Sequence, residues 1–179
     1  MATNASSLMS VYEGWDGYQV SLMRAIAPLS AEQLAYRPAP HLRTVGEIAS
    51  HISLGRIEWF QRMHAPGSAE IAEEAAAWEP EEAAVEHAAE LVRRLEASWQ
   101  MIEKTLTQWS VADLALTFRH SYQGKTYAVS HQWIIWRIMA HDIHHGGELA
   151  VMLGMQGIAL PELGDFGGHL TQPPLAEPS

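Results

Sequence analysis

The segment SHQWIIWRIMAHDIHHGGELAVMLG (130–154) decides the fold, because its apolar residues recur at the three- and four-residue steps of an amphipathic helix. Ser130 is a favourable residue at the start of a helix, and Gly154 is favourable just after its end. The residues that share one face are Ile134, Ile138, His141, His145, Glu148 and Met152. This stripe predicts a helix that packs against others, with two histidines and one carboxylate on the face that should be buried.

Three further segments show the same periodicity. The first covers residues 8–26; the second starts at Thr44, which can form a capping box with Glu47; and the third follows Pro80. No segment shows the convincing alternation of a β-strand. Four amphipathic helices predict an all-α fold, a four-helix bundle within residues 1–164.

The remaining segments should be less regular. Gly14 and Gly17 each weaken the first helix by about 1 kcal/mol relative to alanine, so packing must hold it. A short helix can start at Ser110, and residues 117–127 are the one stretch that could form an irregular hairpin. Residues 165–179, rich in glycine and proline, are expected to form an extended or disordered tail.

Composition narrows the class of protein. The chain has 179 residues, of which 47% are hydrophobic, which suits one domain with its own core. It has no cysteine, which excludes disulfides and thiolate metal sites. A net charge of −10 argues against a nucleic-acid partner. We find no run of about 18 apolar residues and no signal peptide, so we expect a cytoplasmic protein without a membrane partner.

The ten histidines carry most of the functional information. His141 and His145 lie four residues apart, so they point the same way from one helix. This spacing alone also suits two polar residues on a bundle surface. Their place in the apolar stripe favours a bound metal, because buried imidazoles are costly without a partner. His51 lies on the inner side of the second helix and reaches the same level if the two helices are antiparallel, so we expect a metal ion between the three.

The other histidines are weaker candidates. His144 is turned toward the side of the bundle, where a contact with a neighbouring helix or a dimer partner is expected. His131 lies nearly three turns from His141, too far to share an ion. The remaining five are expected in loops or on surfaces: His41, His64, His87, His120 and His169.

Two motifs resemble a known family. The runs TVGEIASHI (44–52) and HDIHHGGELAVML (141–153) resemble the two signatures of the DinB/YfiT-like superfamily, and Tyr36-Arg37-Pro38 and LGMQGIALPELGD (153–165) support them. The resemblance covers nearly the whole chain. It implies an up-down-down-up four-helix bundle, often dimeric, that binds one divalent metal ion per chain, zinc or nickel above all. The implied ligands match His51, His141 and His145.

One departure from that family concerns Gly146-Gly147-Glu148, where relatives usually have Arg-Gly-Gln. Glu148 could orient a ligand, bind the metal weakly or act as a base, and we expect it to assist the site. Asp142 makes HDIHH similar to the zincin motif HExxH, but the shorter side chain and the upstream third ligand argue against a protease. Asp142 is expected to bond to a neighbouring side chain or to stay solvated.

Three neutral imidazoles leave a coordination position open, as in catalytic zinc sites. Such a position can activate water or take a thiol as thiolate. The resemblance implies either a hydrolase or a transferase of low-molecular-weight thiols to small electrophiles, or an isomerase of maleylpyruvate; a homodimer is also implied. The alternative is a metal-stabilised binding or stress-related module without catalysis. Trp59, Trp133 and Trp136 could line a substrate pocket or belong to the core.

Overall fold

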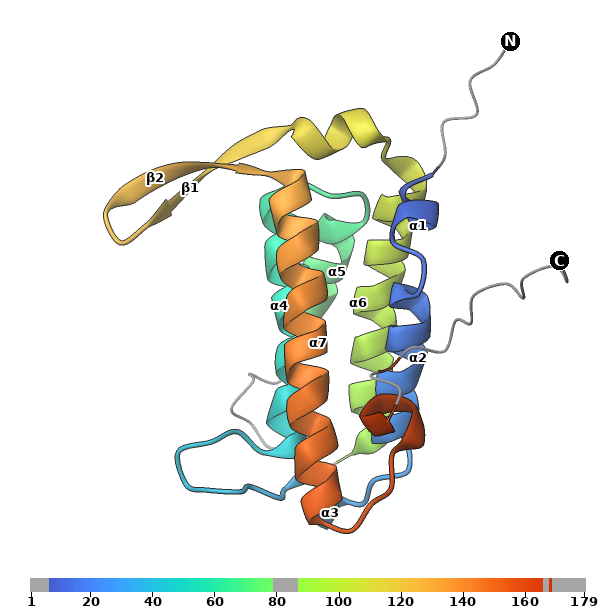
Figure 1. Ribbon diagram of the computed structural model, residues 1–179. Helices are drawn as coiled ribbons and strands as arrows, with labels where there is room; N and C mark the ends of the chain where they lie inside the picture. Colours follow the sequence, from blue (N-terminus) through green and yellow to red (C-terminus); the bar gives the residue numbers. More distant parts are fainter. Residues whose placement is uncertain (1–6, 79–86, 166–167, 169–179) are drawn as a thin grey trace, which may run out of the picture.

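The computed structural model describes residues 7–78, 87–165 and 168, and this part of the chain is mostly helical. Its longest helices lie side by side along one axis (Figure 1): α2 (Trp15–Ile26), α4 (Val45–Arg62), α6 (Ala88–Gln108) and α7 (His131–Met155). The shorter elements are α1 (Leu8–Val11), α3 (Ala31–Leu34), α5 (Ser68–Ala75), η1 (Val111–Ala115), β1 (Thr117–Tyr122), β2 (Lys125–Ser130) and η2 (Pro161–Asp165). No helix in the described ranges is both long and apolar enough to span a membrane.

The predicted apolar stripes form the core. Helix α4 packs against both α6 and α7, and α2 packs against α6. In the α7 stripe Ile134 and Ile138 are fully buried, and His145 and Met152 are buried beside them. Of the two histidines in this stripe, His145 is buried and His141 is half-buried, so both lie on the inward face of α7, as the periodicity predicts.

The helix boundaries follow the capping residues. Thr44 and Glu47 form the predicted capping box at the start of α4, and the Ser130 hydroxyl accepts a hydrogen bond from the Trp133 amide at the start of α7. Helix α7 ends at Met155, one residue past the predicted cap Gly154. The third predicted helix is α6, which is described from Ala88 onward; its expected start at Pro80 lies outside the described residues.

The first predicted helix is two helices. The chain turns at Gly14, whose φ of 98° is in the left-handed region, so α1 ends at Val11 and α2 begins at Trp15. The expectation of one helix over residues 8–26 is wrong here. A left-handed residue interrupts the hydrogen-bond ladder, and glycine adopts that conformation without a steric penalty. Residues 166–167 and 169–179, most of the expected tail, lie outside the described residues.

Residues 117–130 form a regular β-hairpin. Strands β1 and β2 pair antiparallel, from Thr117 opposite Ser130 to Tyr122 opposite Lys125. The two connecting residues, Gln123 and Gly124, have φ values of 49° and 73°, as in a tight type I′ turn. The hairpin is regular and extends to Ser130, whereas the sequence predicted an irregular hairpin over residues 117–127. Most residues of both strands are exposed. The strands therefore do not need alternating apolar and polar residues, which is the pattern by which a strand is found in a sequence.

Candidate metal centre

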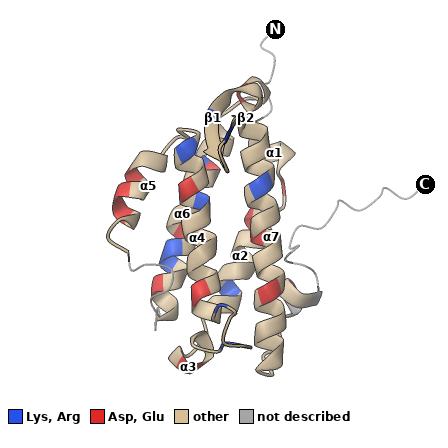
Figure 2. Ribbon diagram, turned by 90° about the vertical axis from the view of Figure 1, so that its left-hand side faces the viewer, with Lys and Arg blue, Asp and Glu red and all other residues tan. Residues whose placement is uncertain are grey.

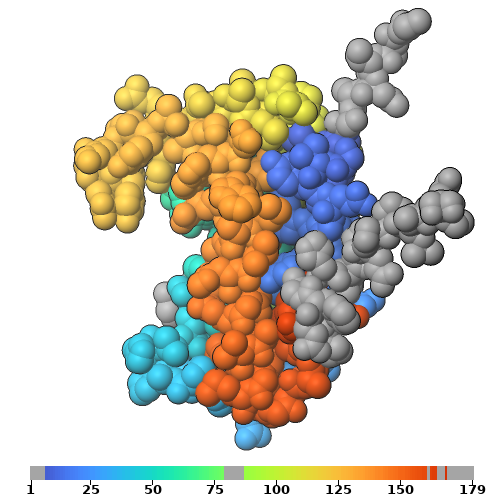
Figure 3. Space-filling model, viewed as in Figure 1, coloured from blue at the N-terminus to red at the C-terminus, as the bar shows by residue number. Residues whose placement is uncertain are grey.

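The face formed by α4 and α7 is framed at both ends. The β1–β2 hairpin projects from one end of this face, and the α3–α4 loop (residues 35–44) projects from the other (Figures 1 and 2). The space-filling view shows a recess between these two projections (Figure 3). The three predicted histidines come from the two helices of this face.

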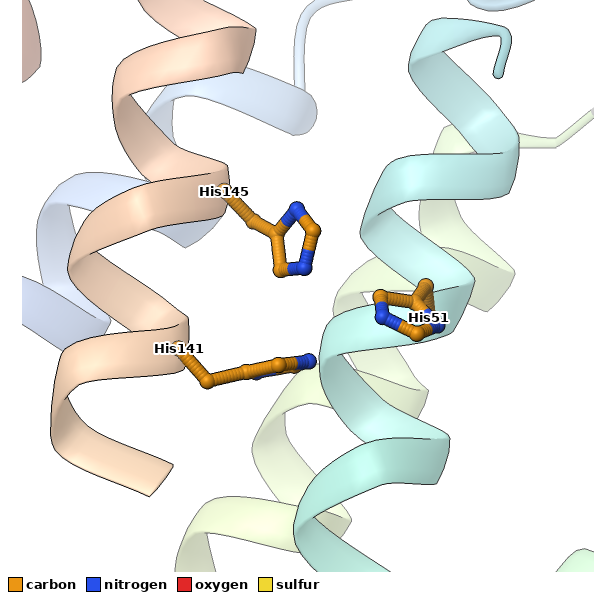
Figure 4. Close-up of side chains that lie close together, drawn as sticks. All are labelled: His51, His141 and His145. Carbon is orange, nitrogen blue, oxygen red and sulfur yellow. The ribbon is translucent and has the colours of Figure 1, made fainter. Parts of the chain in front are cut away.

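The structure brings His51, His141 and His145 together. His51 comes from α4, the other two come from α7, and the three rings converge between the helices (Figure 4). The ring centroids lie 4.9 Å apart for His51 and His141, 4.7 Å for His51 and His145, and 4.4 Å for His141 and His145. His145 is buried and the other two are half-buried, so the group is partly accessible to solvent.

This group fits a metal ion. One nitrogen from each ring lies within 4.8 Å of the others. Around a tetrahedral ion with bonds of about 2.1 Å, such nitrogens are about 3.4 Å apart, so small ring rotations are enough to close the site. No fourth His, Asp or Glu in the described part of the chain joins all three. The group could therefore hold a divalent ion and leave a position open.

Glu148 supports His145 from behind. Nδ1 of His145 lies 2.7 Å from Oε2 of Glu148, so the N–H at Nδ1 donates to the carboxylate and Nε2 is left for a metal. Burial, and less strongly His141 and His51, lower the pKa of His145 to about 4, against the opposing effect of Glu148. The ring is therefore neutral at pH 7, as a metal ligand must be.

His144 forms a second group with His145 and Glu148. Its Nε2 lies 3.4 Å from Oε1 of Glu148, and its side chain is 67% exposed. Both contacts are with residues of its own helix, so the expected contact with a neighbouring helix is not among them, and a contact with a dimer partner stays a prediction. His131 lies elsewhere, stacked on Trp109 with ring centroids 4.4 Å apart.

A buried ion pair lies behind His141. Asp142 and Arg56 are both fully buried, with 2.8 Å between Nη2 of Arg56 and Oδ2 of Asp142. Trp15 donates its indole N–H to the same oxygen at 2.9 Å. Burial alone would raise the pKa of Asp142, but the Arg56 guanidinium holds it below its ordinary value. Of the two alternatives for Asp142, bonding to a neighbouring side chain is confirmed.

The carboxylate of Asp142 also lies close to the ring of His141. Oδ1 of Asp142 lies 3.6 Å from Nδ1 of His141, which is buried and has no hydrogen-bond partner. A small movement would bring these atoms into hydrogen-bond distance, which would leave Nε2 of His141 for a metal. His141 and His145 therefore each have a carboxylate on the side away from the group.

Arg56 is the residue that sequence reasoning missed. Besides Asp142, it donates through Nη1 to Oε1 of Gln19 at 2.7 Å. The signal was present, because Arg56 follows Ile52 by four residues and precedes Phe60 by four, which places it on the inward face of α4. A charged residue in an apolar stripe is as informative as the histidines of α7.

Two glycines make room for this arrangement. A Cβ on Gly55 would lie 3.0 Å from Cε1 of His141, so the absence of a side chain there lets the imidazole approach α4. A Cβ on Gly146 would lie 1.9 Å from the hydroxyl of Tyr18. That hydroxyl is 3.2 Å from the carbonyl oxygens of Asp142 and Ile143. Tyr18 thus occupies the space that a side chain at position 146 would need.

Cavities lie on both sides of the histidine group along this face. One, of about 1180 Å³, is lined by the α3–α4 loop and by residues of α4 and α7 that include Ile48, His144 and Glu148. The other, of about 610 Å³, lies under the hairpin and is lined by Trp59, Trp133 and other residues. These two tryptophans therefore line a pocket, whereas Trp136 is 60% exposed.

A comparison with known protein families gives a match over most of the chain, in which the sequence model of the DinB family covers residues 1–165. The chain belongs to the DinB family. Among solved structures it resembles a DinB-like protein from Bacillus cereus ATCC 10987, with a TM-score of 0.64, 18% identity, and coverage of 84% of this chain and 93% of that one.

A second DinB-like protein, from Bacillus subtilis, has a TM-score of 0.58 and 16% identity, and the match covers 84% of this chain and 94% of that one. At these identities the likeness shows the fold. A search of curated proteins found no match.

Proposed function

We propose that this chain is a metal-dependent enzyme in which His51, His141 and His145 hold one zinc or nickel ion per chain. The observation that carries the proposal is the convergence of three imidazoles, with ligand atoms within 4.8 Å of one another and no fourth protein ligand in the described residues. Structural zinc sites have four protein ligands, whereas catalytic sites have three and keep one position open. Imidazole suits both metals.

The proposed reaction is nucleophilic attack on a small electrophile. When bound, the ion lowers the pKa of a water or thiol at its open position and supplies a nucleophile near neutral pH. The chain itself holds His145 in one tautomer through Glu148 and keeps Asp142 ionised behind His141 through Arg56. A small molecule would bind in one of the cavities beside the group, of which one is lined by Glu148 and the other by Arg137. Hydrolysis and transfer of a low-molecular-weight thiol both use this arrangement.

The test is a paired activity screen. Metal-loaded protein should hydrolyse an activated ester such as 4-nitrophenyl acetate, or couple a small thiol to 1-chloro-2,4-dinitrobenzene, faster than the same protein after chelation. The His141→Ala variant should match the chelated protein, and His144→Ala should match the wild type. Equal rates with and without metal in both assays would favour the alternative, a metal-stabilised binding module without catalysis.

A separate prediction concerns the carboxylate of Glu148, which lies beside Nδ1 of His145. Glu148→Ala should weaken metal binding by about 10–100-fold, because the Nδ1–H of His145 loses its acceptor and the ring loses its orientation. Glu148→Gln should keep most of the affinity, since the amide oxygen can still accept that hydrogen bond. Competition with a coloured chelator measures both. Equal losses in the two variants would show that the negative charge, not orientation, is what Glu148 contributes.

Two further features are proposed with the function. An up-down-down-up arrangement of α2, α4, α6 and α7 is supported by the DinB family match and by the path of the chain in Figure 1. A homodimer is supported by exposed apolar residues on α7, of which Val151 and Met155 are 65% and 61% exposed. Neither feature is needed for the histidine group to form.

A further inference from the structure

The cavity under the hairpin has aromatic walls. It has a volume of about 610 Å³ and is bounded by one side of the hairpin and by α4 and α7. The lining residues are Trp59, His120, Tyr122, Tyr127, Ala128, Val129, Ser130, Trp133 and Arg137. The Trp59 ring contacts those of His120 and Trp133 edge-on, with centroids 5.3 Å and 5.9 Å apart. Such walls suit a flat, unsaturated molecule.

The hairpin presents this aromatic side because of its register. His120 pairs with Tyr127, and cross-strand partners lie on the same face of a two-stranded sheet. Tyr122, two residues after His120, lies on that face as well. The face therefore carries three rings toward the two tryptophans of the helices.

Arg137 makes the cavity cationic. Its guanidinium lies 4.7 Å from the Trp59 ring centroid and 5.5 Å from that of Trp133. No carboxylate in the described residues pairs with it, and no Asp or Glu lines the cavity, in a chain whose net charge is −10. Stacking on the rings leaves the N–H edge of the guanidinium free to bind a carboxylate through two hydrogen bonds.

Arg62 provides the contrast. Its guanidinium also lies over Trp59, at 5.3 Å, but it pairs with Glu58 at 2.5 Å and does not line the cavity. The two arginines share one aromatic partner and differ in whether a carboxylate neutralises them. Arg62 is thus an internal control for Arg137.

The cavity lies next to the histidine group. Arg137 precedes His141 by four residues, so both lie on the same face of α7, about 6 Å apart along the axis. We propose that this cavity binds an aromatic carboxylate, with Arg137 as the anion-binding residue and the rings of Trp59 and Trp133 against its flat face. That this carboxylate is the substrate of the metal centre rests on the proposed function. That the cavity binds an aromatic carboxylate does not.

Benzoate is the probe, and benzamide, of nearly the same shape but without charge, is the control ligand. Both are titrated into chelated protein by calorimetry, so that no metal can bind the carboxylate. Wild type should bind benzoate at least about tenfold more tightly than benzamide, since a charge-assisted pair adds at least that much. Arg137→Gln should weaken the affinity for benzoate by about tenfold and leave the affinity for benzamide unchanged. Arg137→Lys should recover part of the lost benzoate affinity.

The matched variant Arg62→Gln should change benzoate affinity by less than about twofold, because Arg62 is already paired. Equal losses in the Arg62 and Arg137 variants, equal affinities for the two ligands, or no saturable benzoate binding would each overturn the inference. Metal binding is measured separately, on the same preparations before chelation and after reloading with zinc or nickel. A chain that takes up no metal but binds benzoate through Arg137 would refute the proposed function alone, and one that takes up about one ion but shows no such benzoate binding would refute this inference alone.

Discussion

Replacing Asp142 by alanine is expected to lower the free energy of unfolding by about 3–5 kcal/mol, the range seen when one partner of a buried ion pair is removed. Arg56 and Asp142 are both fully buried, and Asp142 also accepts a hydrogen bond from the indole of Trp15. The substitution leaves the Arg56 guanidinium charged and without its counter-ion. It also leaves the Trp15 N–H without an acceptor, which adds to the cost.

Urea unfolding of the chelated protein measures this effect without a contribution from bound metal. The control is Glu58→Ala, which removes an ion pair of the same kind between exposed side chains, Arg62 and Glu58. That loss should stay below about 1 kcal/mol. If Asp142→Ala also costs less than about 1 kcal/mol, the buried pair between Arg56 of α4 and Asp142 of α7 does not contribute to stability as predicted.

The second large effect concerns stabilisation by metal. Because the ion would bind the folded chain through side chains of two helices, a free ion concentration about 100 times the dissociation constant should stabilise wild type by about 2.7 kcal/mol. His141→Ala should gain almost none of this, since only two imidazoles remain. The chelated forms of the two proteins should differ much less, because His141 has no hydrogen-bond partner at Nδ1 without a metal.

Thermal unfolding with and without zinc or nickel measures both quantities. The matched control is His144→Ala, three residues along the same helix and 67% exposed in its side chain, which should keep the full metal-induced rise. If metal no longer raised the unfolding temperature of His144→Ala but still raised that of His141→Ala, the ion would be held by His144, His145 and Glu148 instead.

The sequence predicted those parts of the fold that depend on local pattern. The apolar stripe of α7 and the capping box at Thr44 and Glu47 act over a few residues, so periodicity and cap chemistry locate both helices. The break at Gly14 was missed because the apolar pattern continues through it, although glycine was known to weaken that helix. The hairpin was underestimated because its aromatic face meets a cavity, not the core, and so lacks a buried alternation.

The candidate site was predictable where a polar residue occupies an apolar position. His141, His145 and His51 could be found in this way, and Arg56 could have been found by the same reasoning. The partners of these residues could not, because they depend on how helices pack. Nothing local in the sequence indicates that Trp15 reaches Asp142, or that Gly55 faces the ring of His141.

X-ray absorption at the metal edge is the most direct test of the three-histidine centre. For purified protein with about one zinc or nickel ion per chain, the account predicts three imidazole nitrogens at about 2.0–2.1 Å, with the remaining position taken by an oxygen from solvent. Each of the variants His51→Ala, His141→Ala and His145→Ala should lower the imidazole count or lose the ion. A site with fewer than three imidazoles in wild type, or one unchanged by loss of His51, would contradict the account.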